Sequence, residues 1–151
     1  MSMGLDLKIY EDITNDVDLT APHEITEKVY LTQHKAMLIV NWFYRKDAHV
    51  GNLKDVYGES THYVKIYGDD IWEILLALEK VLNEETEWKK DLLAYHYFPV
   101  LYAIPHYVSS VEMWSEEYYN DLTEIYEILK ELMPTNSVYD KERKFFYNIL
   151  W

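Results

Sequence analysis

The chain has 151 residues, of which 49% are hydrophobic and 16% aromatic, and its formal net charge is −13. This length suits one domain, and the apolar content excludes a disordered chain. The charge opposes direct binding to nucleic acid or to an anionic membrane. The charge suits a basic protein partner, or it serves only to keep the protein soluble. We therefore expect a single acidic domain over residues 1–151.

Cysteine is absent from the sequence. This excludes disulfide scaffolds, cysteine-ligated zinc, iron–sulfur sites and thiol nucleophiles, and it fits a cytoplasmic protein. The longest apolar stretch, residues 36–44, is interrupted by Asn41 and is far shorter than the ~20 residues that span a membrane. The N-terminal residues lack the basic and apolar regions of a secretory signal. We expect no membrane association.

Strands are predicted where apolar and polar side chains alternate. Leu5, Leu7 and Ile9 alternate with polar neighbours, and this period of two is typical of a half-buried strand. Residues 11–22 are rich in Asn, Asp and Thr and predict a loop or a weak edge hairpin. Residues 98–104 also alternate, but the nearby prolines favour an edge strand. Further strands are predicted over residues 25–31, 61–67 and 144–151.

Helices are predicted where apolar residues recur three and four positions apart. Residues 33–45 show this spacing after Thr32, a candidate N-cap, although the β-branched pair Ile39 and Val40 leaves a strand open as the alternative. After the glycine at position 68, Asp69 is expected to cap a second helix that ends near residue 83.

A further short helix is expected over residues 87–95. The clearest helix begins after Ser115, has two glutamates in its first turn and ends before Pro134. Together these elements predict an α+β fold: an antiparallel or mixed sheet of four to five strands, with about three helices packed mainly on one face.

Several short motifs resemble a family of small uncharacterised phage and prophage proteins. Members open with Met-Gly-Leu-Asp, and residues 4–6 here read Gly-Leu-Asp. The Lys-Ala and Asn-Trp-Phe elements of the family's first helix recur within residues 35–43, and the family's aromatic C-terminal strand resembles residues 145–151, ending in Trp151. The family's Arg, Asn and His positions in that helix differ here, and its Gly-Phe-Phe-Phe-Gly segment is absent. The resemblance implies a viral origin, the cytoplasm of a host cell as location, and a fold, but no chemistry.

The common catalytic and phosphate-binding motifs are absent. The four glycines lie too far apart for a P-loop or a dinucleotide-binding turn, and no Gly-x-Ser-x-Gly motif occurs. No two of the six histidines are four residues apart, the spacing of a helical metal site. A metal held by His96, His106 and Glu112 stays open as an alternative, and so does a divalent cation bound by Asp16 and Asp18. We expect no catalytic residue, no metal and no cofactor.

The leading hypothesis is a phage-encoded interaction protein that binds and inhibits a basic host protein, in its sharper form a nucleic-acid-binding protein of a defence system such as CRISPR. An acidic surface can occupy a nucleic-acid groove by imitating phosphate charge. Tyrosine is also enriched where proteins bind one another. The candidate contact residues are the carboxylates Glu116, Glu117, Asp121, Glu124, Glu127 and Glu131 and the aromatics Tyr97, Tyr102 and Tyr107.

Two alternatives from other classes stay open. The first is a small enzyme or ligand-binding protein of phage nucleotide metabolism, which needs a pocket where His96, His106, Tyr102 and Glu112 converge. The second is a self-assembling structural protein, in which the C-terminal strand ending in Trp151 pairs across a homodimer.

Overall fold

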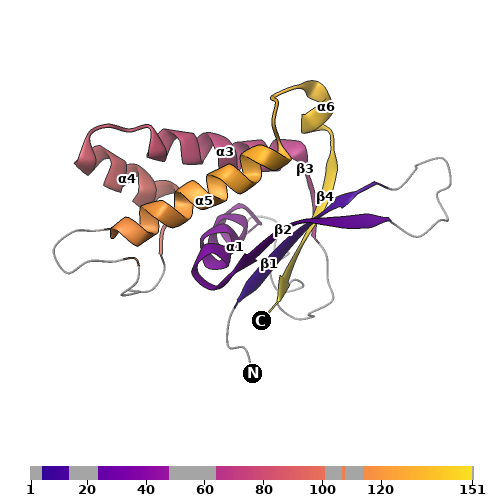
Figure 1. Ribbon diagram of the computed structural model, residues 1–151, viewed down its shortest axis with the longest axis horizontal. Coiled ribbons are helices and arrows are strands. Elements are labelled where there is room, and N and C mark those ends of the chain that lie inside the picture. Colours follow the sequence, from indigo (N-terminus) through magenta and orange to yellow (C-terminus); the bar gives the residue numbers. More distant parts are fainter. Residues whose placement is uncertain (1–4, 14–23, 48–63, 101–106, 108–113, 151) are drawn as a thin grey trace.

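The computed structural model describes residues 5–13, 24–47, 64–100, 107 and 114–150, and these form a four-stranded sheet with helices packed against it (Figure 1). The strands are β1 (Asp6–Asp12), β2 (Ile25–Thr32), β3 (Val64–Tyr67) and β4 (Lys144–Leu150). The helices are α1 (Gln33–Asp47), α3 (Gly68–Leu82), α4 (Glu87–Tyr97), α5 (Glu116–Leu132) and the short α6 (Val138–Lys141).

The sheet is antiparallel throughout, in the order β2-β1-β4-β3. Leu7 lies opposite Leu31 on β2 and opposite Ile149 on β4, so apolar side chains line up across three strands. The register shifts by one residue next to Ile9, where β2 bulges. The fold is therefore α+β, as the alternating pattern predicts.

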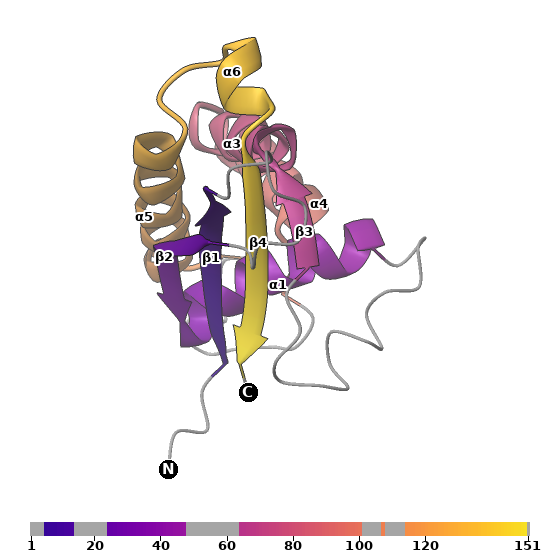
Figure 2. The same cartoon turned by 90° about the vertical axis from the view of Figure 1, so that its right-hand side faces the viewer.

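The helices cover one face of this sheet, and the core lies between them. In Figure 2 the strands are in front and α1 crosses behind them. Leu7 and Ile9 are fully buried on the covered face, and the ring of Phe43 on α1 stacks on Tyr147 with 4.2 Å between ring centroids. The polar residues between them in β1, such as Lys8, stay partly exposed on the other face.

Residues 33–47 form a helix, which settles the alternative left open by Ile39 and Val40. Both side chains are buried in the core, at 0% and 3% exposure. Helix α1 follows directly from β2 through Gln33, whose φ of 52° lies in the left-handed region and reverses the chain without a separate loop. Tertiary burial here outweighs the modest helix propensity of β-branched residues.

Some predicted details are wrong. Asp69 does not cap α3; instead Asp70 reaches back and its Oδ2 accepts a hydrogen bond of 2.8 Å from the backbone N–H of Tyr67. Strand β1 continues to Asp12, where a loop was expected from residue 11, because β2 and β4 pair with that end. Helix α6 was not predicted, since four residues are too few to show a period.

Two further predictions concern the chain's aromatic segments. Residues 98–100 are not a strand, and the rest of the expected edge strand, 101–104, lies outside the described residues. Strand β4 lies inside the sheet, and its residues 145–147 are paired on both sides, with β1 and with β3. This part of the C-terminal strand therefore has no free edge with which to pair across a homodimer.

Candidate protein-interaction surface

Helix α5 positions most of the predicted contact residues. Its start is fixed by Ser115, whose side-chain oxygen accepts a hydrogen bond of 3.3 Å from the backbone N–H of Tyr118. Tyr118, Leu122, Ile125 and Leu129 recur at helical spacing and are all buried. This apolar stripe fixes the rotation of the helix, so the side of the helix opposite to it faces solvent.

The solvent side of α5 carries a row of exposed carboxylates, which we call the acidic face. It spans about 22 Å from its first to its last member, at 1.5 Å per helical residue. A DNA strand has one phosphate per ~3.4 Å of duplex axis, so the same length of one strand presents about six charges. The acidic face consists of Glu116, Glu117, Glu124, Glu127 and Glu131.

Most of the acidic face has no cation partner within the described part of the chain. Glu124 forms an ion pair with Lys35 of α1, which sequence reasoning missed because the two residues are far apart in the chain. Among the described residues no lysine or arginine pairs with the other four members. Their charges are therefore directed to solvent, where a basic surface can reach them.

Asp121 does not belong to the acidic face, and this corrects the prediction. It is half-buried, and its Oδ2 accepts a 2.6 Å hydrogen bond from the hydroxyl of Tyr107. Tyr107 is itself fully buried, with its ring edge-on to Tyr118. Burial, and then the bond to Asp121, raises the pKa of the Tyr107 hydroxyl far above its usual value. Tyr107 is therefore not exposed to a partner, and Asp121 is only partly exposed.

The other two predicted aromatics give no exposed patch within the described chain. Tyr97 is half-buried at the end of α4, where Lys80 donates a 3.4 Å hydrogen bond to its hydroxyl. Tyr102 lies outside the described residues. Of the nine predicted contact residues, the structure therefore brings five together on one exposed surface.

A buried aromatic cluster ties α4 to the first turn of α5. The rings of Trp114 and Tyr118 stack at 4.2 Å. Trp114 Nε1 donates to the carbonyl oxygen of Asp91 at 3.1 Å, and the hydroxyl of Tyr119 donates to the Asp91 carboxylate. The Tyr118 hydroxyl donates to the carbonyl oxygen of Phe98 at 2.7 Å. Burial raises the pKa of both tyrosines above the ordinary range, so they remain neutral donors.

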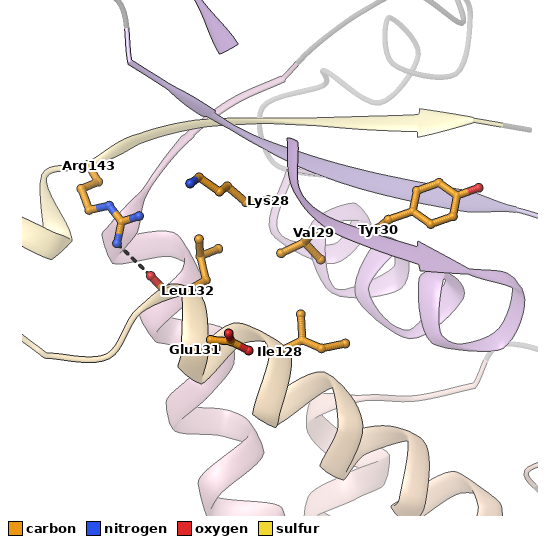
Figure 3. Close-up of a pocket in the computed structure, with 7 residues that line it drawn as sticks. All are labelled: Lys28, Val29, Tyr30, Ile128, Glu131, Leu132 and Arg143. Carbon is orange, nitrogen blue, oxygen red and sulfur yellow. Dashed lines mark hydrogen bonds between the residues drawn. The ribbon is translucent and has the colours of Figure 1, made fainter. Parts of the chain in front are cut away.

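A groove of about 520 Å³ opens between edge strand β2 and the C-terminal half of α5 (Figure 3). Its floor is formed by Val29, Ile128 and Leu132, and Glu131 of the acidic face borders it. Arg143 also borders it, but its guanidinium is already bound: it donates to both carboxylate oxygens of Glu11, at 2.8 and 2.9 Å, and to the Leu132 carbonyl at 2.8 Å. An anionic ligand would have to displace these contacts to reach the Arg143 guanidinium.

The predicted histidine site is not assembled within the described residues. His96 is exposed on α4, whereas His106, Tyr102 and Glu112 lie outside the described part of the chain. His34 packs its ring 5.3 Å from that of Tyr107. Among the residues that the structure describes, no group of three histidine, aspartate or glutamate side chains is arranged to hold a metal ion. Nor is any described helix both long and apolar enough to cross a membrane.

Comparisons of the chain with protein-family models, with curated proteins and with solved structures find no match. The resemblance to phage proteins therefore stays a prediction, and the case for function depends on the surface of the molecule.

Proposed function

We propose that this protein binds a basic surface of another protein through the acidic face of α5. The observation that carries the proposal is the exposed row of carboxylates, of which only Glu124 has a cation partner among the described residues. Such a row places like charges close together in the free protein, and a basic partner relieves their repulsion. The net charge of −13 adds long-range attraction, which accelerates association with a positively charged protein.

The partner class follows from the length and spacing of the charges. A rigid helix with five carboxylates over about 22 Å approaches the charge density of one strand of duplex DNA. A groove that evolved to hold a nucleic-acid backbone would accept such a helix. Together with the sequence resemblance to phage proteins, this supports a phage-encoded inhibitor of a nucleic-acid-binding host protein, such as a defence nuclease.

The test is affinity capture from a bacterial lysate at low and at moderate salt, followed by purification of the retained protein. The proposal expects a basic, nucleic-acid-binding protein whose affinity falls steeply as salt rises, since exposed charge pairs are screened within about 10 Å at 0.1 M salt. Duplex DNA should compete with the acidic protein for it. Binding that is insensitive to salt, or that persists unchanged with DNA bound, would contradict the proposal.

A further inference from the structure

Helix α4 exposes an apolar stripe that no described part of the chain covers. Of its 11 residues only Ala94 is buried. Trp88, Leu92 and Tyr95 are instead 63%, 54% and 60% exposed. Large apolar side chains on a helix usually face the core, and a contiguous exposed group of them usually marks an interaction site. We call these three residues the α4 stripe.

The α4 stripe has the spacing of a helix that binds in a groove. Its members are at positions i, i+4 and i+7, which lie on one side of a helix. The opposite side packs against α3: Ala94 is fully buried, and Lys80 of α3 donates a 3.4 Å hydrogen bond to the Tyr97 hydroxyl. On the flank toward α5, Asp91 accepts a hydrogen bond from the Tyr119 hydroxyl. The helix is therefore held by the body of the protein while the α4 stripe faces away from it.

We propose that the α4 stripe is a docking surface that inserts as a helical ridge into an apolar groove of a different protein. Trp and Tyr are the side chains that most often dominate such contacts. The proposal goes beyond the acidic face, because it concerns a separate helix and an apolar rather than an electrostatic contact.

The charges beside the α4 stripe define the edges of the groove. Glu87 is exposed and lies one turn before Asp91, on the side of α4 that faces α5. Lys89 is exposed on the other side. The partner's groove should therefore have a basic edge toward α5, the side on which the acidic face begins, and an acidic edge on the far side.

A second copy of this chain fits the α4 stripe poorly. The three side chains leave about 300–400 Å² exposed, since a large aromatic side chain covers about 150–250 Å². Two stripes facing each other would bury about 700 Å², whereas stable interfaces bury about 1,200 Å² or more. Two copies would also bring together two net charges of −13. A concave groove can bury the flanks of α4 together with the stripe, which adds contact area, and a partner that is not acidic avoids the charge repulsion.

The experiment compares the full-length protein with a stripe variant carrying Trp88→Ala, Leu92→Ala and Tyr95→Ala. Both are used to capture proteins from a bacterial lysate at low and at high salt, and each protein retained preferentially by the wild type is purified for calorimetry. We expect the stripe variant to bind about 100-fold or more weakly at both salt concentrations, because apolar contacts are not screened. Its heat-capacity change on binding should also be less negative.

The control variant removes three other exposed apolar side chains, with Leu76→Ala, Val138→Ala and Tyr139→Ala; these are 49%, 70% and 79% exposed. It should bind like the wild type, and both variants should melt like the wild type. The proposal is overturned if no protein distinguishes the wild type from the stripe variant, or if both variants lose affinity equally. It is also overturned if light scattering shows a dimer that only the stripe variant dissolves. Loss of binding on neutralising the acidic face, with the stripe variant unaffected, would sink this inference alone.

Discussion

Replacing Gly68 by alanine should destabilise the protein, because the position has no room for a Cβ atom. Gly68 begins α3, and its backbone N–H donates to the carbonyl oxygen of Arg143 at 2.8 Å. A Cβ built there would lie 1.9 Å from the carbonyl oxygen and 2.9 Å from the carbonyl carbon of Asp140. It would also lie 2.9 Å from Cε of Met133. The methionine can move away, but the backbone carbonyl cannot move alone.

The size of the effect follows from that geometry. To restore an ordinary contact the Asp140 carbonyl must retreat by roughly 1.5 Å, from 1.9 to 3.4 Å. The same oxygen accepts the backbone N–H of Arg143 at 3.2 Å, so the turn into β4 must shift with it. Overpacking costs about 1–3 kcal/mol, and the rigid backbone places this case near 3 kcal/mol. For a chain of this size that corresponds to a melting temperature lower by about 6–12 °C.

Urea unfolding followed by circular dichroism measures this change. The matched control is Asp69→Ala at the next, exposed position of the same helix turn, which should change the free energy of unfolding by less than about 1 kcal/mol. Glycine-to-alanine changes at open helix positions usually stabilise a protein. A Gly68→Ala protein that is as stable as the wild type, or more stable, would therefore refute the close approach of α3 to α6.

Two further predictions concern the ion pairs that join β1 to the turn before β4. Arg143→Met should lower the free energy of unfolding by about 3 kcal/mol, because it leaves the Glu11 carboxylate largely buried without its cation. The stability of Arg143→Lys should lie between those of the wild type and Arg143→Met. A loss below about 1 kcal/mol for Arg143→Met in urea unfolding would contradict this prediction. The hydrogen bond from Thr135, followed by the charge of Arg143, lowers the pKa of Asp140 below its usual value. A carboxyl whose pKa is lower in the folded than in the unfolded state stabilises the protein at pH values above its unfolded pKa. This stabilisation is lost as the pH falls through the pKa of the folded state. The difference in unfolding free energy between the wild type and Asp140→Asn should therefore be largest near neutral pH and shrink below about pH 4; a difference that stays constant from pH 7 to pH 3 would argue against it.

The sequence predicts the parts of the fold that depend on local periodicity. Leu7 and Ile9 alternate with polar residues, and the sheet buries both. Tyr118, Leu122 and Ile125 recur at helical spacing, and α5 buries all three. In each case the pattern of a few neighbouring side chains determines both the type of element and the face that packs inward.

Contacts between distant residues could not be predicted in this way. Arg143 and Glu11 are separated by 132 positions, and each has the appearance of an ordinary solvated charge in the sequence. Asp121 has the same appearance among its acidic neighbours, although it is half-buried and accepts a hydrogen bond from Tyr107. Charged and hydroxyl side chains carry no local signal of burial, because their partners come from other elements.

The α4 stripe shows a different limit. The sequence spacing of Trp88, Leu92 and Tyr95 is that of a buried face, and periodicity alone would direct these residues toward the core. The structure exposes them because the opposite side of α4, with the buried Ala94 and the half-buried Tyr97, packs against α3. Which of two possible faces a short helix buries is decided by tertiary contacts.

The most direct test of the central claim is the effect of neutralising the acidic face on binding to the basic protein captured from lysate. The test variant carries Glu117→Gln, Glu127→Gln and Glu131→Gln. The control removes the same three charges elsewhere with Asp69→Asn, Glu85→Gln and Glu142→Gln, all at exposed positions. Asp69 matches Glu117, since both are acids in the first turn of a helix.

We predict that the test variant binds about 3- to 100-fold more weakly, at about 0.2–1 kcal/mol for each exposed charge pair lost, and that its affinity depends less on salt. The control variant should stay close to the wild type. Equal losses in both variants would mean that only net charge matters, and unchanged affinity in the test variant would mean that α5 does not contact the partner; either result would contradict the account.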